Sequence, residues 1–344
     1  MDKLTDYAVE QAVALLNIDS PTGYTADASE YVLNTLHAMG FSAALTNKGG
    51  VLADLGGSDA ENALLIEAHI DTLGCMVAEI KSDGRLRLTN LGGVGVNNIE
   101  SENCRIITKF NGSYEGTVQL INPSIHVNHE YRDTKRDFDS VELVIDEDVN
   151  SKEQAEALGI RVGDLVCFDT RTRVLKSGYI KSRFLDDKLS SGILLSLAKY
   201  VSDNHISLSR RVYLHFTVYE EVGHGGSGSV PEGITEALAV DMGCVGKGIS
   251  CTEKQVSICA KDAGGPYSYD MVKKLISSAN KSKADYAIDV YPYYGSDVEA
   301  TLRSGADVRH GLIGPGVYAS HGYERSHVDG VRNTLLVLLG FLDI

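Results

Sequence analysis

Histidine and carboxylate side chains recur in this chain at places where short apolar runs end. His69 and Asp71 follow the apolar run at residues 63–68, and further acids stand at Asp186 and Asp187, at Glu220 and Glu221, and at Asp241. One imidazole with several carboxylates is a ligand set that suits Zn²⁺, Co²⁺ or Mn²⁺. Two such ions about 3.5–4 Å apart can activate water and stabilise an oxyanion, and they need a bridging carboxylate. A separate carboxylate must then move the proton.

Each group in this set also has an ordinary structural explanation. His69 could be a hydrogen-bonded core histidine, and the Asp pair could cap the N-terminus of a helix. The Glu pair could form a solvated strand end. These explanations weaken when all three groups stand at the tips of predicted strands, because buried acids are costly unless they are paired or bound to metal. We therefore predict a metal site.

The elements that must position these groups can be predicted from the hydrophobic pattern. Short apolar runs predict buried strands at residues 63–68, 211–218, 237–240 and 308–313. Helical periodicity marks residues 4–16, 27–39 and 330–342, with further helical segments after Asp187 and after Ser296. This alternation predicts an α/β fold with a mixed, largely parallel sheet flanked by helices. Since ligands gather beyond the carboxyl ends of parallel strands, we expect the separated groups to converge there.

The middle of the chain has a different pattern. From about residue 73 to 177, short alternating runs are separated by Gly, Asn and Asp, as in CMVAEIKSDGRLRLTN and YEGTVQLIN. Such a pattern is typical of small antiparallel strands in a barrel-like unit. We predict that residues 1–72 and 178–344 form one domain, and that residues 73–177 form an inserted β-rich domain.

Composition restricts the class of protein. The chain has 344 residues and a formal net charge of −15, and it contains no Lys/Arg cluster of the kind that binds nucleic acid. None of the six cysteines forms a C-x-x-C pair, which indicates reduced thiols. The first residues lack the pattern of a signal peptide, and the most apolar late stretch, 334–342, is too short to span a membrane. We expect a cytoplasmic protein that binds neither nucleic acid nor membrane.

Two further motifs carry weaker signals. His126 and His129 could suggest a second metal site, but no acidic cluster stands near them at ligand spacing, so we expect surface or substrate-proximal histidines. The GHGGSG segment at residues 223–228 lacks the Lys-Ser/Thr of a phosphate-binding loop. We expect a tight turn beside the site.

The chain resembles the dinuclear metallo-aminopeptidases that include glutamyl aminopeptidase and the tetrahedral (TET) aminopeptidases. The motifs that carry the resemblance are AHID at 68–71, SKEQAEALGIRVGD at 151–164, FLDDK at 184–188, EEVG at 220–223, VDMG at 240–243 and YGSD at 294–297. The stretch at 151–164 contains no residue with an expected catalytic role, so its match indicates common descent.

The resemblance implies a role for each residue of the set. His69 would bind one metal ion and Glu221 the other, Asp186 would bridge them, and Asp241 would complete one shell. The peptide bond between Asp186 and Asp187 is expected to be cis. Asp71 would orient the imidazole of His69, and Glu220 would be the general base. The ions would be Zn²⁺ or Co²⁺, with Mn²⁺ as a further candidate.

The remaining family ligand is a histidine near the C-terminus. The segment YASHGYERSHVDG offers His321 and His327. His321 is the better match because its distance from the last helix is close to that in the family, and His327 is the rival.

The function implied by the resemblance is hydrolysis of the N-terminal peptide bond of short peptides, by a homo-oligomer that would be a dodecamer. The inserted domain would contribute to oligomer contacts. One alternative keeps the site but makes the protein an amidase for a specific small or N-acylated peptide, such as an osmolyte dipeptide. The other alternative is a metal-binding scaffold without catalysis, which the intact Glu220 argues against.

Overall fold

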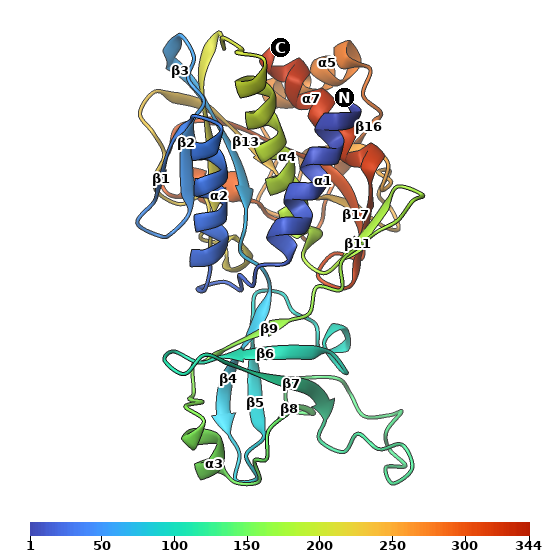
Figure 1. The fold of residues 1–344 in the computed structure, drawn as a ribbon. Coiled ribbons are helices and arrows are strands. Elements are labelled where there is room, and N and C mark those ends of the chain that lie inside the picture. The colour runs from blue at the N-terminus through green and yellow to red at the C-terminus, as the bar shows by residue number, and fades with distance from the viewer. The chain divides into compact units, whose positions relative to one another are not determined.

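A computed structural model describes all residues 1–344, which form two compact units (Figure 1). The first unit consists of residues 1–71 and 171–344, and the second of residues 72–170.

The first unit is built on a large mixed sheet. Its central path runs in the order β1-β2-β12-β3-β13-β17-β18-β11-β10, and β14, β15 and β16 join it beside β17. The strands are β1 (Ser42–Leu45), β2 (Val51–Asp54), β3 (Asp59–His69), β10 (Arg173–Val174), β11 (Tyr179–Ser182), β12 (Arg210–Thr217), β13 (Ile234–Val240), β14 (Gly243–Val245), β15 (Val256–Lys261), β16 (Tyr286–Val290), β17 (Arg309–Tyr318) and β18 (Glu324–His327).

The centre of this sheet is parallel and its flanks are antiparallel. β12, β3, β13 and β17 pair in parallel, whereas β1, β2, β18, β11 and β10 pair antiparallel. The predicted runs lie in the four parallel strands. Within β3, Leu64, Leu65 and Ile66 are all fully buried, as is expected of a strand covered on both faces. The predicted α/β fold with a mixed sheet is confirmed.

Helices cover the sheet. They are α1 (Asp2–Leu16), α2 (Ala26–Ala38), α4 (Leu185–Asp203), α5 (Tyr269–Ser282), α6 (Asp297–Arg303) and α7 (Val328–Leu342). α1 and α4 approach closely because residue 192 is a glycine. A Cβ at Gly192 would lie 2.4 Å from the carbonyl oxygen of Ala8 and 2.8 Å from the backbone nitrogen of Ala12. The first turn of α4 carries two of the candidate acids, so this contact helps to fix their position.

A buried lysine joins the same two helices. Lys188 is 1% exposed, and its ammonium donates to the carbonyl oxygens of Leu15 and Ile18, at 2.9 and 2.7 Å. The last carbonyl groups of a helix have no partner within the helix and favour a cation. Lys188 therefore ties the end of α1 to the beginning of α4, one residue beyond Asp187.

The second unit is a closed barrel with the strand order β4-β5-β8-β7-β6-β9. Its elements are β4 (Gly74–Ile80), β5 (Leu86–Leu91), the short helix η1 (Val96–Asn98), β6 (Asn103–Ile107), β7 (Ser113–Leu120), β8 (Val141–Ile145), α3 (Lys152–Ala157) and β9 (Leu165–Phe168). Alternate residues such as Leu86 and Leu88 are buried, which confirms the expected alternation. The loop between β7 and β8 carries His126 and His129, both exposed. None of the helices combines the length and the hydropathy of a membrane span.

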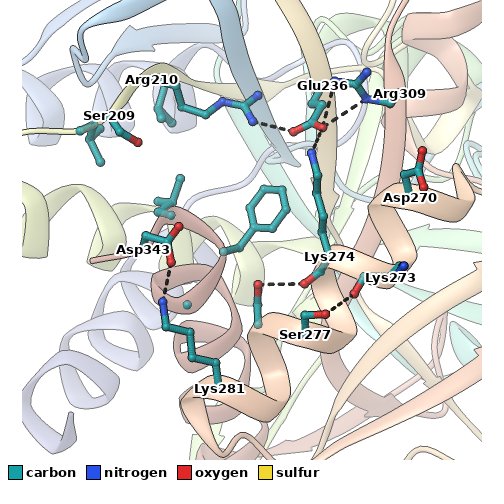
Figure 2. Close-up of a pocket in the computed structure, with 16 residues that line it drawn as sticks. Ser209, Arg210, Glu236, Asp270, Lys273, Lys274, Ser277, Lys281, Arg309 and Asp343 are labelled. Atoms are coloured by element: carbon teal, nitrogen blue, oxygen red, sulfur yellow. Dashed lines mark hydrogen bonds and ion pairs between the residues drawn. The ribbon is translucent and has the colours of Figure 1, made fainter.

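The amino ends of three sheet strands meet around one buried acid. Glu236 of β13 is 1% exposed and accepts hydrogen bonds from Arg210 of β12, Lys274 of α5 and Arg309 of β17 (Figure 2). Burial opposes ionisation of Glu236, but the hydrogen bonds from Lys274 and Arg210 keep its pKa below the usual value. A cavity of about 700 Å³ lies here. The charge of Glu236 is fully matched, so we assign it a structural role.

We expect Glu236→Gln to lower the free energy of unfolding by about 2 kcal/mol, because it weakens charged hydrogen bonds to a buried group. Urea denaturation at neutral pH measures this. The matched control is Lys281→Ala in the same cavity, where Lys281 and its partner Asp343 are 68% and 74% exposed. That change should stay within about 0.5 kcal/mol. Equal effects of the two substitutions would contradict the role of Glu236.

Candidate metal centre

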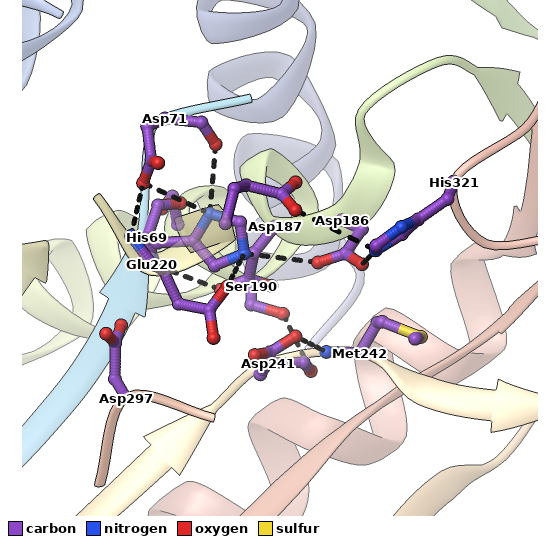
Figure 3. A network of polar contacts seen from close by, with 12 residues as sticks. His69, Asp71, Asp186, Asp187, Ser190, Glu220, Asp241, Met242, Asp297 and His321 are labelled. Carbon is purple, nitrogen blue, oxygen red and sulfur yellow. Dashed lines mark hydrogen bonds and ion pairs between the residues drawn. The ribbon is translucent and has the colours of Figure 1, made fainter. Parts of the chain in front are cut away.

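The candidate acids and histidines converge at the carboxyl ends of the parallel strands. His69 is the last residue of β3, Glu220 and Glu221 lie in the short helix η2 (Glu220–Val222) after β12, and Asp241 follows β13. Asp186 lies in the first turn of α4, and His321 follows β17. Figure 3 shows the side chains of His69, Asp186, Glu220, Asp241 and His321 gathered in one place. The structure thus brings together residues from five elements that are far apart in the sequence.

Asp186 lies between two imidazoles. Its Oδ1 is 3.2 Å from Nε2 of His69, and its Oδ2 is 3.6 Å from Nε2 of His321. The carboxylate is 8% exposed, and the peptide bond from Asp186 to Asp187 is cis. A carboxylate that presents one oxygen to each of two histidines has the arrangement expected of a group shared between two ions.

Glu221 lies beside one of the two imidazoles and Asp241 beside the other. Glu221 Oε2 lies 3.8 Å from Nε2 of His321, and its other oxygen is buried without a hydrogen-bond partner. Asp241 lies on the side of His69, where ligand atoms of His69, Asp187 and Asp241 are all within 4.8 Å of one another. An acid oxygen that is buried and unpaired within such a cluster fits a cation. The residues present therefore fit one ion beside His321 and another beside His69.

Asp187 is a member of the cluster for which no role could be predicted from the motifs. It is fully buried, and its Oδ2 accepts a hydrogen bond from the backbone N–H of His69 at 3.2 Å. Its Oδ1 has no hydrogen-bond partner. Because one oxygen already holds the main chain of His69, Asp187 is less available than Asp186 to be shared between two ions.

Asp71 acts on His69 through its main chain. Nδ1 of His69 lies 2.9 Å from the carbonyl oxygen of Asp71 and 3.6 Å from its carboxylate. Since a carbonyl oxygen only accepts, Nδ1 donates to it, and Nε2 is the ring nitrogen that remains for an ion. Without an ion, and against the effect of burial, Asp186 raises the pKa of His69, so that Nε2 carries a proton and donates to the Asp186 carboxylate. The carboxylate of Asp71 instead accepts from the backbone N–H of Glu220 at 3.1 Å and from the Thr22 hydroxyl at 2.7 Å.

Glu324 is a second acid that the sequence did not reveal. It is 2% exposed, and its two oxygens accept from the backbone N–H groups of Asp186 and His321, at 3.1 and 2.9 Å. One carboxylate thereby joins the main chains of two candidate ligands that are far apart in the sequence. The only available sequence signal was its place between the two candidate histidines.

His327 lies outside the cluster. Its Nδ1 accepts from the backbone N–H of Asp329 and caps α7, and its Nε2 lies 3.0 Å from the carbonyl oxygen of Ser177. Both ring nitrogens are thus engaged elsewhere. The structure places His321, and not its rival, beside Asp186 and Glu221.

Residues 49–336 match the M42 glutamyl aminopeptidase family. The chain belongs to this family. The protein YhfE of Bacillus subtilis, which carries the name of an aminopeptidase, is 43% identical over 94% of each chain. The resemblance inferred from the motifs is thereby confirmed, and the chain is a peptidase.

Solved structures share the fold. Aminopeptidase APDkam598 from the archaeon Desulfurococcus kamchatkensis matches with a TM-score of 0.88 at 24% identity, over 98% of this chain and 95% of that chain. The TET1 peptidase of Pyrococcus horikoshii, which can assemble into a tetrahedron or a large octahedral shell, matches with a TM-score of 0.84 at 23% identity, over 97% and 99%.

The electrostatics of this M42 site follow from burial and crowding of like charges. Burial and neighbouring acids raise the pKa of Asp241 to about 7 and hold the pKa of Glu220 and Glu221 well above the usual range. Burial also tends to raise the pKa of Asp186, but hydrogen bonds from His321 and His69 outweigh it, and this pKa lies below its usual value. Burial disfavours the charged form of His321, yet Asp186 raises its pKa to about 10. The acids thus outnumber the groups that could neutralise them.

The loop after η2 is packed tightly beside the cluster. Lys48 donates to the carbonyl oxygens of His224 and Gly225, and a Cβ at Gly225 would lie 1.9 Å from Oδ1 of Asp297. A Cβ at Gly226 would lie 2.3 Å from the carbonyl oxygen of Asp297. The GHGG segment is therefore a turn that needs its glycines, which also fixes the adjoining Glu220 and Glu221.

We expect the metal-free protein to lose stability between pH 5 and pH 8. Asp241 has a folded-state pKa of about 7, above its ordinary value, and His321 has one of about 10. A raised folded-state pKa gives stability that is present at low pH and lost as the pH rises toward that pKa. Thermal unfolding after chelation measures this, and Zn²⁺ in excess should remove most of the fall.

Asp241→Asn is the control for this experiment, because it removes one of the crowded charges and should flatten the profile of the metal-free protein. A metal-free protein that became more stable from pH 5 to pH 8 would contradict the analysis.

Proposed function

We propose that this peptidase hydrolyses the N-terminal peptide bond of short peptides with the help of two divalent ions, Zn²⁺ or Co²⁺ foremost and Mn²⁺ next. The observation that carries the proposal is the placement of the two Asp186 oxygens toward different histidines, His69 and His321. In this assignment His69 and Asp241 would hold one ion, His321 and Glu221 would hold the other, and Asp186 would be available to both. When bound, the ions supply Lewis-acid chemistry, which polarises a carbonyl group and lowers the pKa of water.

Glu220 is the general base of the proposed reaction. Its Oε2 lies 3.8 Å from Nε2 of His69, and it lines the cavity of about 420 Å³ that opens over the candidate ligands. It would take a proton from the attacking water and return it to the leaving amine. The bond from the Glu220 N–H to Asp71 fixes the backbone that carries this side chain. Asp71 is thus a positioning residue for both His69 and Glu220.

The charge of the cavity favours the amino end of a peptide. Among its lining residues are Asp186, Glu220, Glu221 and Asp241, and there is no lysine or arginine. A carboxypeptidase needs a cationic group for the terminal carboxylate of its substrate. A free ammonium group, in contrast, is attracted by an acidic cavity. The lining therefore supports aminopeptidase rather than carboxypeptidase activity.

The proposal also includes an oligomeric state and a cellular compartment. The related TET1 peptidase can assemble into a tetrahedron or a large octahedral shell, and a solved form of it is a dodecamer. The near-complete overlap with it supports a homo-oligomer, specifically a dodecamer. A mass of one subunit, measured by light scattering, would contradict this.

All six cysteines are free thiols, which supports a location in the reducing environment of the cytoplasm.

Substitution of the two adjacent glutamates should separate catalysis from metal binding. We expect Glu220→Gln to lower kcat by about 10²–10⁴-fold while the metal content stays the same, because only proton transfer is lost. Glu221→Gln should instead lower the metal content. Steady-state kinetics and elemental analysis of both proteins measure this. Full turnover by Glu220→Gln would contradict the assigned base.

A chelator and a blocked substrate test the reaction itself. We expect the protein to cleave Leu-Ala-Ala but not acetyl-Leu-Ala-Ala, and to lose this activity on chelation and regain it with Zn²⁺, Co²⁺ or Mn²⁺. Liquid chromatography of the products, with the metal content of each sample, measures this. Cleavage of the acetylated peptide alone would point to an amidase for blocked peptides, and activity that resists complete metal removal would defeat the mechanism.

A further inference from the structure

The cavity over the candidate ligands has one wall that takes no part in the proposed chemistry. This wall consists of Met242 after β13, Cys244 in β14, and Tyr293, Tyr294 and Gly295 in the turn before α6. An aminopeptidase must accommodate the side chain of the first substrate residue beside the bond that it cleaves. The wall is therefore the surface that this side chain would contact.

The chemistry of the wall is apolar and polarizable. Met242 is 3% exposed and presents a thioether, and Cys244 is partly exposed and presents a small thiol. The hydroxyl of Tyr294 donates to the main-chain oxygen of Met242 at 3.1 Å, so its polar end is engaged and its ring remains for contact. Thioethers and aromatic rings pack well against flexible apolar side chains.

No lysine or arginine lines this cavity, so the chain presents no side-chain cation that is free to pair with an acidic substrate side chain. The charged lining consists of four candidate site acids and His321, and the latter faces Asp186 and Glu221. A carboxylate placed here would enter a desolvated space without a hydrogen-bonding cation, beside acids that already repel one another.

A neighbouring small cavity does not alter this conclusion. It measures about 70 Å³ and is lined by Glu220, Asp297, Glu299 and Arg303 among others. The Arg303 guanidinium already lies 2.8 Å from a carboxylate oxygen of Glu299. The one cation beside this space is therefore already paired, and the three acids that line it, Glu220, Asp297 and Glu299, oppose a further carboxylate.

We propose that this chain prefers peptides whose first residue is apolar, with Met and Leu best, and that it discriminates against Glu and Asp at that position. The inference rests on the proposed aminopeptidase function and gives its substrate class. It departs from the specificity that the family description, glutamyl aminopeptidase, would suggest.

The first test uses the native, metal-loaded protein and four peptides, X-Ala-Ala with X being Leu, Met, Gln or Glu. Gln and Glu are nearly equal in shape, so their ratio of kcat/KM isolates the effect of charge. We expect Leu and Met to exceed Gln, and Gln to exceed Glu by at least about tenfold. Cleavage of Glu-Ala-Ala as fast as Gln-Ala-Ala would overturn the proposal. Failure to cleave any of the four peptides would instead defeat the aminopeptidase function.

The second test changes the wall. Cys244→Arg places a cation beside the first residue, and Cys244→Met is the matched control that adds length without charge. We expect the Gln-to-Glu ratio to fall by about tenfold in Cys244→Arg and to stay within about twofold of the native ratio in Cys244→Met. An unchanged ratio in a folded Cys244→Arg protein would show that the wall does not contact the first residue. If Cys244→Arg does not fold, as shown by thermal unfolding, the native ratio alone decides.

Discussion

The burial of many acids at one edge of a sheet is the constraint on which the rest of this structure depends. Asp186, Asp187, Glu220, Glu221 and Asp241 crowd around His69 and His321, and most are almost removed from water. Such a cluster is unfavourable as long as its charges repel one another in a medium of low dielectric. Two imidazoles cannot balance it, so the fold must hold the acids in place against their repulsion until cations compensate for it.

The structure holds them with hydrogen bonds from backbone N–H groups to other acids of the same site. Asp187 accepts from the N–H of His69, and Asp71 accepts from that of Glu220. Glu324 accepts from those of Asp186 and His321. The main chains of four residues are therefore each fixed by the carboxylate of another residue. These four are His69, Asp186, Glu220 and His321. Additional acids in the site serve as anchors, because a carboxylate with partners on the main chain is stabilised without consuming a cation.

The sequence predicted which residues would gather but not how they would be held. His69, Glu220 and Asp241 were predictable because each ends a short apolar run, and runs of that kind become parallel strands whose carboxyl ends meet. The anchoring by Glu324 was not predictable, because it depends on where two backbone N–H groups lie after the chain has folded. The contact between His69 and Asp71 also depends on the folded backbone. The resemblance suggested that Asp71 orients His69, but it did not specify that the carbonyl oxygen of Asp71 accepts from Nδ1.

The choice between His321 and His327 likewise depends on contacts that form only in the folded chain. Both stand near the closing helix, and their distance to it could only rank them. The structure separates them, because His327 is the N-cap of α7, where Nδ1 accepts from the Asp329 N–H and Nε2 lies 3.0 Å from the Ser177 carbonyl oxygen. A histidine that caps a helix has no free lone pair for an ion. The preference therefore rests on tertiary contacts, which no local pattern encodes.

The two edges of the sheet support the assignment of function by contrast. At the amino ends of the strands, Glu236 is surrounded by Arg210, Lys274 and Arg309, and every charge has a partner within the chain. At the carboxyl ends, Glu221 and Asp187 each retain a buried oxygen without a hydrogen-bond partner. In this cluster the charge of Glu236 is matched by cations of the chain, although Arg210 Nε has no hydrogen-bond partner and the larger cavity lies beside it. An unmatched cluster of buried acids is stable only with cations that the chain does not supply, and this deficit, rather than the size of a cavity, locates the chemistry at the carboxyl edge.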